Sequence, residues 1–213
     1  MKVTCLFIAL FGLGLIVGCS ETPSGPSTSS VIMPLAVGNQ WVSELTSFDN
    51  NGNPIISLDT FKIESKVFEN GKEVFYSSRN DPYYYLNNTL YTMVDSLPWF
   101  IVQPPKYVSE VVRNDTFVIA ETDSYGDPTG ETYTLFLRQW VKAMDTMITV
   151  KAGTFKCFAY NSTLITPKFG FYQSERSFFS EGVGSIKSES YSDTLGLLEN
   201  LTYSWQLVSY HLN

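Results

Sequence analysis

Alternation of apolar and polar residues with a period of two is the feature that most constrains the fold of this chain. Between Leu201 and Leu207 every second residue is apolar, and each residue between them is Thr, Ser or Gln. Phe61–Val67 shows the same alternation with Lys and Glu. Successive side chains of a β-strand point to opposite faces of a sheet, so this pattern predicts strands with one face on a core and one in water.

Short turns separate these segments and predict how the strands pair. Asn70-Gly71 is a strong hairpin signal, and Asn87-Asn88 joins two further apolar segments in the same way. Tyr and Phe, 13 and 15 residues respectively, also favour strands because aromatic rings fit a pleated surface. We therefore predict about ten to twelve strands and little helix. The expected fold is mainly β: a single antiparallel curved sheet, a half-barrel or a β-sandwich-like domain.

The N-terminus carries a different pattern. One positive charge at Lys2 is followed by an apolar run from Val3 to Val17. A run of about fifteen residues is shorter than the roughly 20 that a membrane-spanning helix needs, but it has the length of a signal peptide. We expect residues 1–18 to be a signal peptide rather than a permanent span.

The end of this segment, Leu15-Ile16-Val17-Gly18-Cys19, resembles the lipobox of bacterial lipoproteins. The resemblance implies cleavage between Gly18 and Cys19, a diacylglyceryl group on the Cys19 thiol, and acylation of the new amine by a chain such as palmitate. Each buried methylene contributes about 0.8 kcal/mol, so two or three chains hold a protein firmly in a membrane. The alternatives are an uncleaved helical anchor and an ordinary secretory signal with an incidental cysteine.

The resemblance also implies a place in the cell, the bacterial cell envelope. Ser20 follows the cysteine, and under the sorting rule of enterobacterial lipoproteins a residue other than Asp there favours the outer membrane over the inner one. The sequence does not indicate which side of that membrane the protein faces, or its oligomeric state.

Residues 19–32 are predicted to be a lipidated N-terminus and flexible tether, and residues 33–213 a single β-rich domain. The segment from Ser20 to Ser30 consists almost entirely of Ser, Thr, Pro, Gly and Glu. Such a segment buries too little apolar surface to offset its loss of conformational entropy. Fully extended, the tether reaches about 40 Å from the membrane.

Three stretches of the mature chain are similar to a group of uncharacterised bacterial lipoproteins and secreted β-rich proteins. They are Pro34–Trp41, Val150–Cys157 and Gly182–Lys187. The resemblance implies a curved sheet or half-barrel, as in periplasmic lipoprotein carriers, and implies no activity. From the residues alone, the glycines of these stretches indicate turns and bulges.

Composition and motifs argue against several functions. The net charge is −7 and the charges of both signs are interspersed, which excludes nucleic acid as a main partner. The only histidine is His211, near the C-terminus, and Cys157 is the only cysteine after Cys19, so we expect no metal, no cofactor and no catalytic triad. A pair of carboxylates remains an alternative for hydrolysis. The candidates are Glu44, Asp59, Glu64, Glu110, Glu121 and Glu175.

The most suggestive side chains form an aromatic group: Tyr83, Tyr84, Tyr85, Tyr91 and Trp99. Consecutive tyrosines in a strand point to both faces, so at least one ring should lie opposite the core and contact a ligand, unless other residues cover it. We therefore expect a non-enzymatic protein, anchored to the membrane, with a binding or interaction role toward an apolar ligand or lipid. The alternative is a surface carbohydrate-binding or adhesive module that uses exposed aromatics.

Overall fold

The computed structural model describes residues 31–49, 51–94, 97–122, 128–193 and 200–213. The strands are β1 Gln40–Phe48, β2 Pro54–Glu69, β3 Lys72–Ser77, β4 Pro82–Leu86, β5 Thr89–Val94, β6 Leu97–Val102, β7 Val111–Thr122, β8 Pro128–Val150, β9 Gly153–Thr166, β10 Phe171–Ser180, β11 Gly184–Asp193 and β12 Asn200–His211. The short 3₁₀ helix η1, Pro167–Phe169, connects β9 and β10. Within the described residues, no helix is long and apolar enough to span a membrane.

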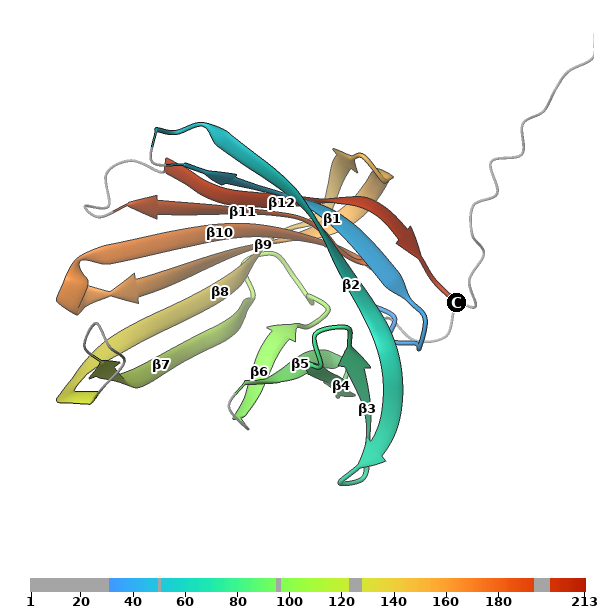
Figure 1. Ribbon diagram of the computed structural model, residues 1–213, viewed down its shortest axis with the longest axis horizontal. Coiled ribbons are helices and arrows are strands. Elements are labelled where there is room, and N and C mark those ends of the chain that lie inside the picture. Colours follow the sequence, from blue (N-terminus) through green and yellow to red (C-terminus); the bar gives the residue numbers. More distant parts are fainter. Residues whose placement is uncertain (1–30, 50, 95–96, 123–127, 194–199) are drawn as a thin grey trace, which may run out of the picture.

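The strands form one twelve-stranded sheet in the order β6-β5-β4-β3-β2-β1-β12-β11-β10-β9-β8-β7, and each pair in it is antiparallel. Every neighbouring pair is consecutive in the chain except β1 and β12, which join the two halves. The sheet curls, so that its β3–β6 part and its β7–β8 part both lie below β1, β10, β11 and β12 in Figure 1. The predicted mainly β, antiparallel fold is confirmed, and of the three predicted shapes the single curved sheet is the one observed.

The predicted hairpin turns are confirmed. Asn70 and Gly71 connect β2 to β3 with φ of 49° and 76°, and Asn87 and Asn88 connect β4 to β5 with φ of 50° and 63°. Two successive residues with positive φ are typical of a type I′ turn, whose twist matches that of the flanking strands. Both turns therefore fix the register of the strands that they connect.

At one place where the sequence pattern predicts a gap between two strands, the structure has a bend within a single strand. The pattern predicts two strands, 132–141 and 146–150, but β8 runs through both as one strand of 23 residues. Register shifts relative to β9 at Val141/Ala143 and Ala143/Thr146 accommodate the residues between them. Such bulges add residues on one strand and increase its bend, so the alternation is interrupted although the strand continues.

Two clusters of buried side chains form the core. The Trp41 cluster contains Trp41, Ile63, Phe75, Val150, Cys157, Ile186 and Leu207. The Tyr160 cluster contains Ile32, Leu90, Val102, Val141 and Tyr160. Met33 and Leu35 pack against both clusters, so the segment that precedes β1 connects the two parts of the core.

This N-terminal segment is bound to the sheet from its first described residue. The Gly182 amide donates to the Val31 carbonyl at 3.0 Å, and the side chain of Ile32 is only 1% exposed. The Tyr85 hydroxyl accepts from the Met33 amide at 3.1 Å and donates to the Met33 carbonyl at 2.6 Å. Ile32, predicted as the last residue of the tether, is therefore part of the packed core.

Candidate functional site

Cross-strand register aligns a row of mostly polar side chains on one face of the sheet. Residues directly opposite each other on neighbouring strands point to the same face. Following the pairings from β7 to β1 gives Arg113, Gln139, Ser162, Glu175, Ser190, Tyr203 and Ser47. We call these seven residues the polar row and the surface that carries them the pocket face.

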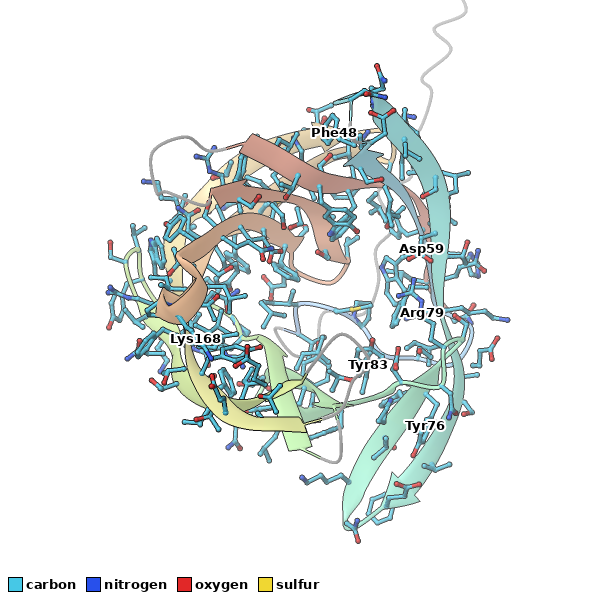
Figure 2. All side chains as sticks on the ribbon, turned by 60° about the vertical axis from the view of Figure 1, so that its left-hand side comes forward. Phe48, Asp59, Tyr76, Arg79, Tyr83 and Lys168 are labelled. Carbon is cyan, nitrogen blue, oxygen red and sulfur yellow. The ribbon has the colours of Figure 1, made fainter. Side chains whose placement is uncertain are left out.

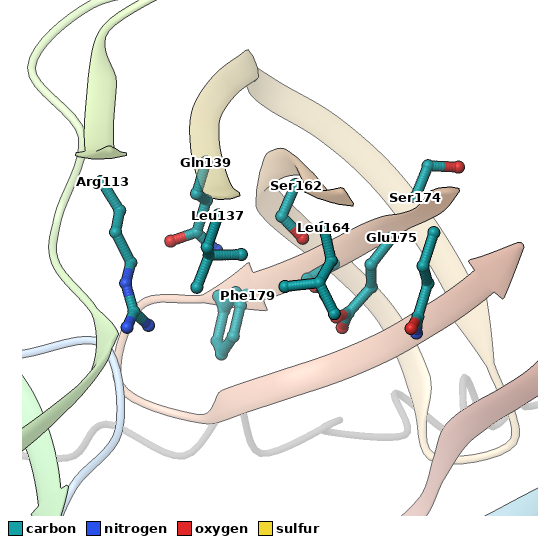
Figure 3. Close-up of a pocket in the computed structure, with 10 residues that line it drawn as sticks. Arg113, Leu137, Gln139, Ser162, Leu164, Ser174, Glu175 and Phe179 are labelled. Carbon is teal, nitrogen blue, oxygen red and sulfur yellow. The ribbon is translucent and has the colours of Figure 1, made fainter. Parts of the chain in front are cut away.

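A pocket of about 350 Å³ lies on the β7–β10 part of the polar row (Figure 3). Its lining residues are Arg113, Leu137, Gln139, Ser162, Leu164, Gln173, Ser174, Glu175, Ser177 and Phe179. In Figure 3 the Ser174 hydroxyl points away from the other labelled side chains, whereas Arg113, Phe179 and Glu175 point into one space. The pocket thus combines apolar and polar side chains on a rigid sheet.

Small buried residues make room for this pocket. Ser177 and Ser188 lie directly opposite each other on β10 and β11, on the pocket face, and both are buried, as is Ser190. On the side of the pocket toward the core, the Phe179 ring packs edge-on against Tyr160, with centroids 5.7 Å apart. Serines at positions where a sheet usually presents bulky apolar residues leave a hollow lined by hydroxyl groups.

Glu175 is the acidic group of the pocket and is held in place from one side. Its Oε1 accepts hydrogen bonds from Ser177 Oγ at 2.8 Å and Ser188 Oγ at 2.5 Å. No side chain in the described part of the protein donates to its Oε2. A carboxylate has room for about four donors on its two oxygens, so Glu175 retains acceptor capacity that is oriented before a ligand arrives.

Some of the other polar side chains in the pocket already have hydrogen-bond or ion-pair partners within the protein, and others do not. The Arg113 guanidinium, in a side chain that is 9% exposed, pairs with the Asp115 carboxylate and lies 5.8 Å from the Phe117 ring centroid. Gln139, Gln173 and Ser162 make no side-chain hydrogen bond among the described residues. The positive charge is therefore compensated within the protein, whereas the two amides and the hydroxyl can bind a ligand.

A second polar group extends the polar row toward β2. Asp59 and Arg79 form an ion pair, and the hydrogen bond that Arg79 donates to Asp59 raises the pKa of Arg79. Burial, together with the negative charges of Asp59 and Glu175, raises the pKa of Tyr203. Tyr203 therefore lies near both carboxylates. Asp59, Arg79 and Tyr83 follow one another along one side of the curled sheet in Figure 2.

The predicted aromatic group packs against the protein itself. Tyr83 packs edge-on against Phe61 with centroids 5.2 Å apart, and the Tyr85 hydroxyl is bonded to Met33. Tyr84 points to the opposite face, as predicted, but it is only 6% exposed. Its ring stacks on that of its cross-strand partner Tyr91, with centroids 5.5 Å apart, and Lys72 Nζ lies 4.6 Å from the Tyr84 ring centroid. None of these four rings lines the pocket on the polar row, whereas Tyr85 is among the lining residues of a second hollow, between the N-terminal segment and the β2–β3 hairpin.

Some predicted site residues lie outside the described residues. This holds for Gly18 and Cys19, and for the side chain of Trp99 on β6. The predicted cleavage and lipidation at Gly18 and Cys19 remain predictions from sequence.

Of the six candidate carboxylates, only Glu175 lines the pocket. Hydrogen bonds from Lys151 and Gln206 lower the pKa of Glu44, and Lys168 pairs with Glu121. Glu110 accepts from the Lys106 amide at 2.6 Å. Among the described residues no group of three or more His, Cys, Asp or Glu side chains is arranged to hold a metal ion.

Cys157 is buried within the Trp41 cluster, and burial raises the pKa of its thiol to about 11. Because the thiolate is the reactive form, we predict that a thiol reagent at pH 8 does not modify Cys157 in the folded protein. In a chain that starts at Val31, where it is the only cysteine, the reagent should react fully in 8 M urea. Mass spectrometry of the two samples would check this; rapid modification without urea would contradict the buried, protonated state.

Comparisons with known proteins identify the fold. No protein-family model and no curated protein matches the sequence. A candidate lipoprotein of Parabacteroides distasonis has a similar structure, with 16% sequence identity and a TM-score of 0.54 over 86% of this chain and 100% of that chain. A candidate exported protein of Bacteroides fragilis with a YmcC-like fold matches with 10% identity and a TM-score of 0.55, also over 86% of this chain and 100% of its own. At these identities the likeness shows a shared fold.

Proposed function

We propose that the protein is a lipid-anchored, non-enzymatic binding protein of the bacterial cell envelope, held in the outer membrane through Cys19, and that it binds its ligand in the pocket on the polar row. The observation that carries the binding role is Glu175. Two serines orient its carboxylate, and one oxygen faces the pocket without a donor from the described residues. Among the described residues no buried side-chain nitrogen or oxygen atom lacks a hydrogen-bond partner, so this second oxygen is open to solvent, and a ligand with donor groups can reach an acceptor that is already oriented.

The lining of the pocket supports binding rather than hydrolysis. Hydrolysis of a glycosidic bond by two carboxylates requires a pair about 5 to 10 Å apart that flanks the substrate. Glu175 is the one carboxylate among the lining residues, and Asp59, which lies beyond Tyr203, is paired with Arg79. A single acceptor surrounded by hydroxyls and amides suits recognition.

The anchor is supported by the N-terminal sequence and by the position of the folded part. The lipobox-like segment ends at Cys19 and the described residues begin at Val31, so the residues between them would reach about 40 Å if they were fully extended. Both proteins of similar fold are described as a lipoprotein or an exported protein. The membrane, through the anchor, is accordingly the first partner that we propose.

A second hollow favours a second candidate, binding of an apolar ligand or lipid. It has a volume of about 600 Å³ and lies between the N-terminal segment and the β2–β3 hairpin, with Leu35, Phe68, Phe75 and Leu86 among its lining residues. The apolar part of this lining suits acyl chains, and Lys72 and Glu73 add one charged group of each sign to it. This alternative places the ligand at a different site from the polar row, so variants can separate the two.

The anchor is tested by cell fractionation of Cys19→Ser. The wild-type protein should sediment with the outer membrane and require detergent for release. Cys19→Ser should keep its signal peptide or appear in the soluble fraction, because no acyl chains hold it. Cys157→Ser is the matched control and should behave like wild type. Undiminished membrane association and unchanged processing of Cys19→Ser would refute the lipid anchor.

The binding site is tested with the full lipidated protein in nanodiscs. Native mass spectrometry would measure binding of three probes: a neutral oligosaccharide, a fatty acid and a short peptide. Ser162→Phe places a ring in the pocket and should abolish binding, whereas Thr163→Phe places the same ring on the opposite face of β9 and should not. If none of the probes binds, or if Ser162→Phe binds as wild type does, the pocket is not the site. Cleavage of the oligosaccharide would refute the non-enzymatic role.

A further inference from the structure

We propose that the ligand of this pocket is a neutral saccharide unit, with Glu175 accepting hydrogen bonds from its hydroxyl groups. The inference rests on the proposed function and adds the chemical class of the ligand. It also places saccharide recognition on the polar row, away from the tyrosines of β4.

The free oxygen of Glu175 requires a ligand that donates. The carboxylate only accepts hydrogen bonds, and Ser177 and Ser188 both donate to Oε1. An acyl chain or another purely apolar ligand would cover Oε2 without a donor, and desolvating a charged group in this way is costly. Hydroxyl or ammonium groups are the ligand groups that supply the donor.

The neighbouring side chains favour a ligand that both donates and accepts. Along the polar row Ser162 lies one strand from Glu175 and Gln139 two strands from it, at about 4.7 to 4.9 Å per strand. An amide and a hydroxyl each donate and accept, and neither side chain has a hydrogen-bond partner among the described residues. A saccharide presents hydroxyl groups on successive ring carbons, and each of these groups can donate to one partner while it accepts from another.

The charges of the pocket disfavour an acidic ligand. Arg113 is the positive group of the lining, and its charge is paired with Asp115. Glu175 then leaves an uncompensated negative charge, which would repel a carboxylate or phosphate. Uronic acids and phosphorylated ligands are therefore poor candidates, and neutral saccharides are better ones.

The apolar side of the pocket matches the remaining surface of a sugar ring. Leu137, Leu164 and Phe179 line it, and Phe179 is held by Tyr160. The C–H face of a pyranose is apolar and can pack against these side chains while its hydroxyls point to the polar row. The volume of about 350 Å³ lies at the small end of the 300 to 1,000 Å³ typical of ligand sites, which suits a single ring.

The test is calorimetric titration of the lipidated protein in nanodiscs with glucose, galactose, N-acetylglucosamine, glucuronic acid and glucosamine. At least one of the three neutral sugars should bind more tightly than the acid. The amine tests the charge of the ligand, because Glu175 attracts an ammonium group, and tighter binding of the amine would mean that the pocket takes a cationic ligand. Glu175→Gln should weaken that binding at least tenfold, because a hydrogen bond to a charged acceptor is lost. Glu189→Gln on β11, whose side chain points to the opposite face, is the matched control and should bind as wild type does.

Circular dichroism would reveal whether Glu175→Gln still folds. If it does not, a second variant, Gln139→Ala, keeps the inference testable. Gln139→Ala removes a side chain that has no partner among the described residues, so it should reduce sugar binding severalfold and leave the urea midpoint unchanged. Binding of glucuronic acid or glucosamine in preference to the neutral sugars would overturn the inference, as would equal binding by wild type, Glu175→Gln and Gln139→Ala. If a fatty acid or peptide binds in a Ser162→Phe-sensitive manner and no sugar does, the saccharide is wrong while the binding function stands. No binding of any probe would overturn both.

Discussion

A chain that starts at Gly38 is expected to lose about 5 kcal/mol or more of its free energy of unfolding relative to a chain that starts at Val31. The shorter chain lacks the buried side chain of Ile32 and the packing of Met33 and Leu35 against both core clusters. Burial of one such side chain contributes about 1.5 to 3 kcal/mol. Because folded domains are stable by only about 5 to 15 kcal/mol, the shorter chain should be largely unfolded at 25 °C.

Urea denaturation of both chains, followed by far-ultraviolet circular dichroism, would measure this difference. The chain from Val31 should unfold in a single cooperative step, since it retains every described contact. Equal urea midpoints for the two chains would show that the N-terminal segment only lies on the surface of the core.

Single substitutions would show which contacts of the segment matter. Ile32→Ala removes a buried side chain and should cost about 2 to 5 kcal/mol. Tyr85→Phe leaves the Met33 amide and carbonyl without a partner and should cost about 1 to 3 kcal/mol. Val37→Ala, at a side chain that is 48% exposed, is the control and should change stability by less than about 0.5 kcal/mol.

The strands and hairpins could be predicted because their signals are local. Alternation from Leu201 to Leu207 and the dipeptide Asn70-Gly71 each act over a few residues, and the structure places β12 and the β2–β3 turn there. The coverage of Tyr84 could have been predicted too. A two-residue turn at Asn87-Asn88 pairs Tyr84 with Tyr91, and a stacked partner covers the ring.

The pocket could not be predicted because it depends on register from β7 to β10, and on β11, whose Ser188 orients Glu175. A slip of one residue moves every side chain of a strand to the other face, and bulges shift the register of β7, β8, β10, β11 and β12. In β11 the sequence alternation is also uninformative. Ser188 and Ser190 face the pocket side while Lys187 and Glu189 face the other, so both faces read as polar.

The burial of Ile32 could not be predicted from the sequence either. Composition separates the Ser- and Pro-rich segment from the rest, but it does not reveal that one apolar side chain at its edge enters the core. Ile32 packs in the Tyr160 cluster with residues of β5, β6, β8 and β9, so it contacts strands from both halves of the curled sheet. Long-range packing, rather than local sequence, decides that Ile32 belongs to the core.

Alkaline pH should destabilise the protein more steeply than a typical domain, because burial raises the pKa of several tyrosines, Tyr160 and Tyr85 most of all. The effect of Tyr85 can be tested through its contact with Met33. Burial raises the pKa of its hydroxyl to about 12, from an ordinary value of 10. The folded state therefore favours the neutral phenol, which donates to the Met33 carbonyl. Its contribution is complete below pH 10 and is lost as the pH rises from 10 toward 12. The rise of the pKa from 10 to about 12 corresponds to about 3 kcal/mol of folding free energy that is lost once the phenol ionises.

The measurement is the free energy of unfolding in urea at pH 8, 10 and 11.5. Tyr85→Phe should be less stable than wild type at pH 8 and should lose less stability above pH 10, because phenylalanine has no proton to release. Tyr107→Phe, at an exposed ring, should follow the wild-type pH dependence. Cys157→Ser should flatten the curve in a lower window, from pH 9 to 11, since burial raises the pKa of that thiol from 9 to about 11. Parallel curves for wild type and Tyr85→Phe would mean that the phenol is not buried against Met33 in solution.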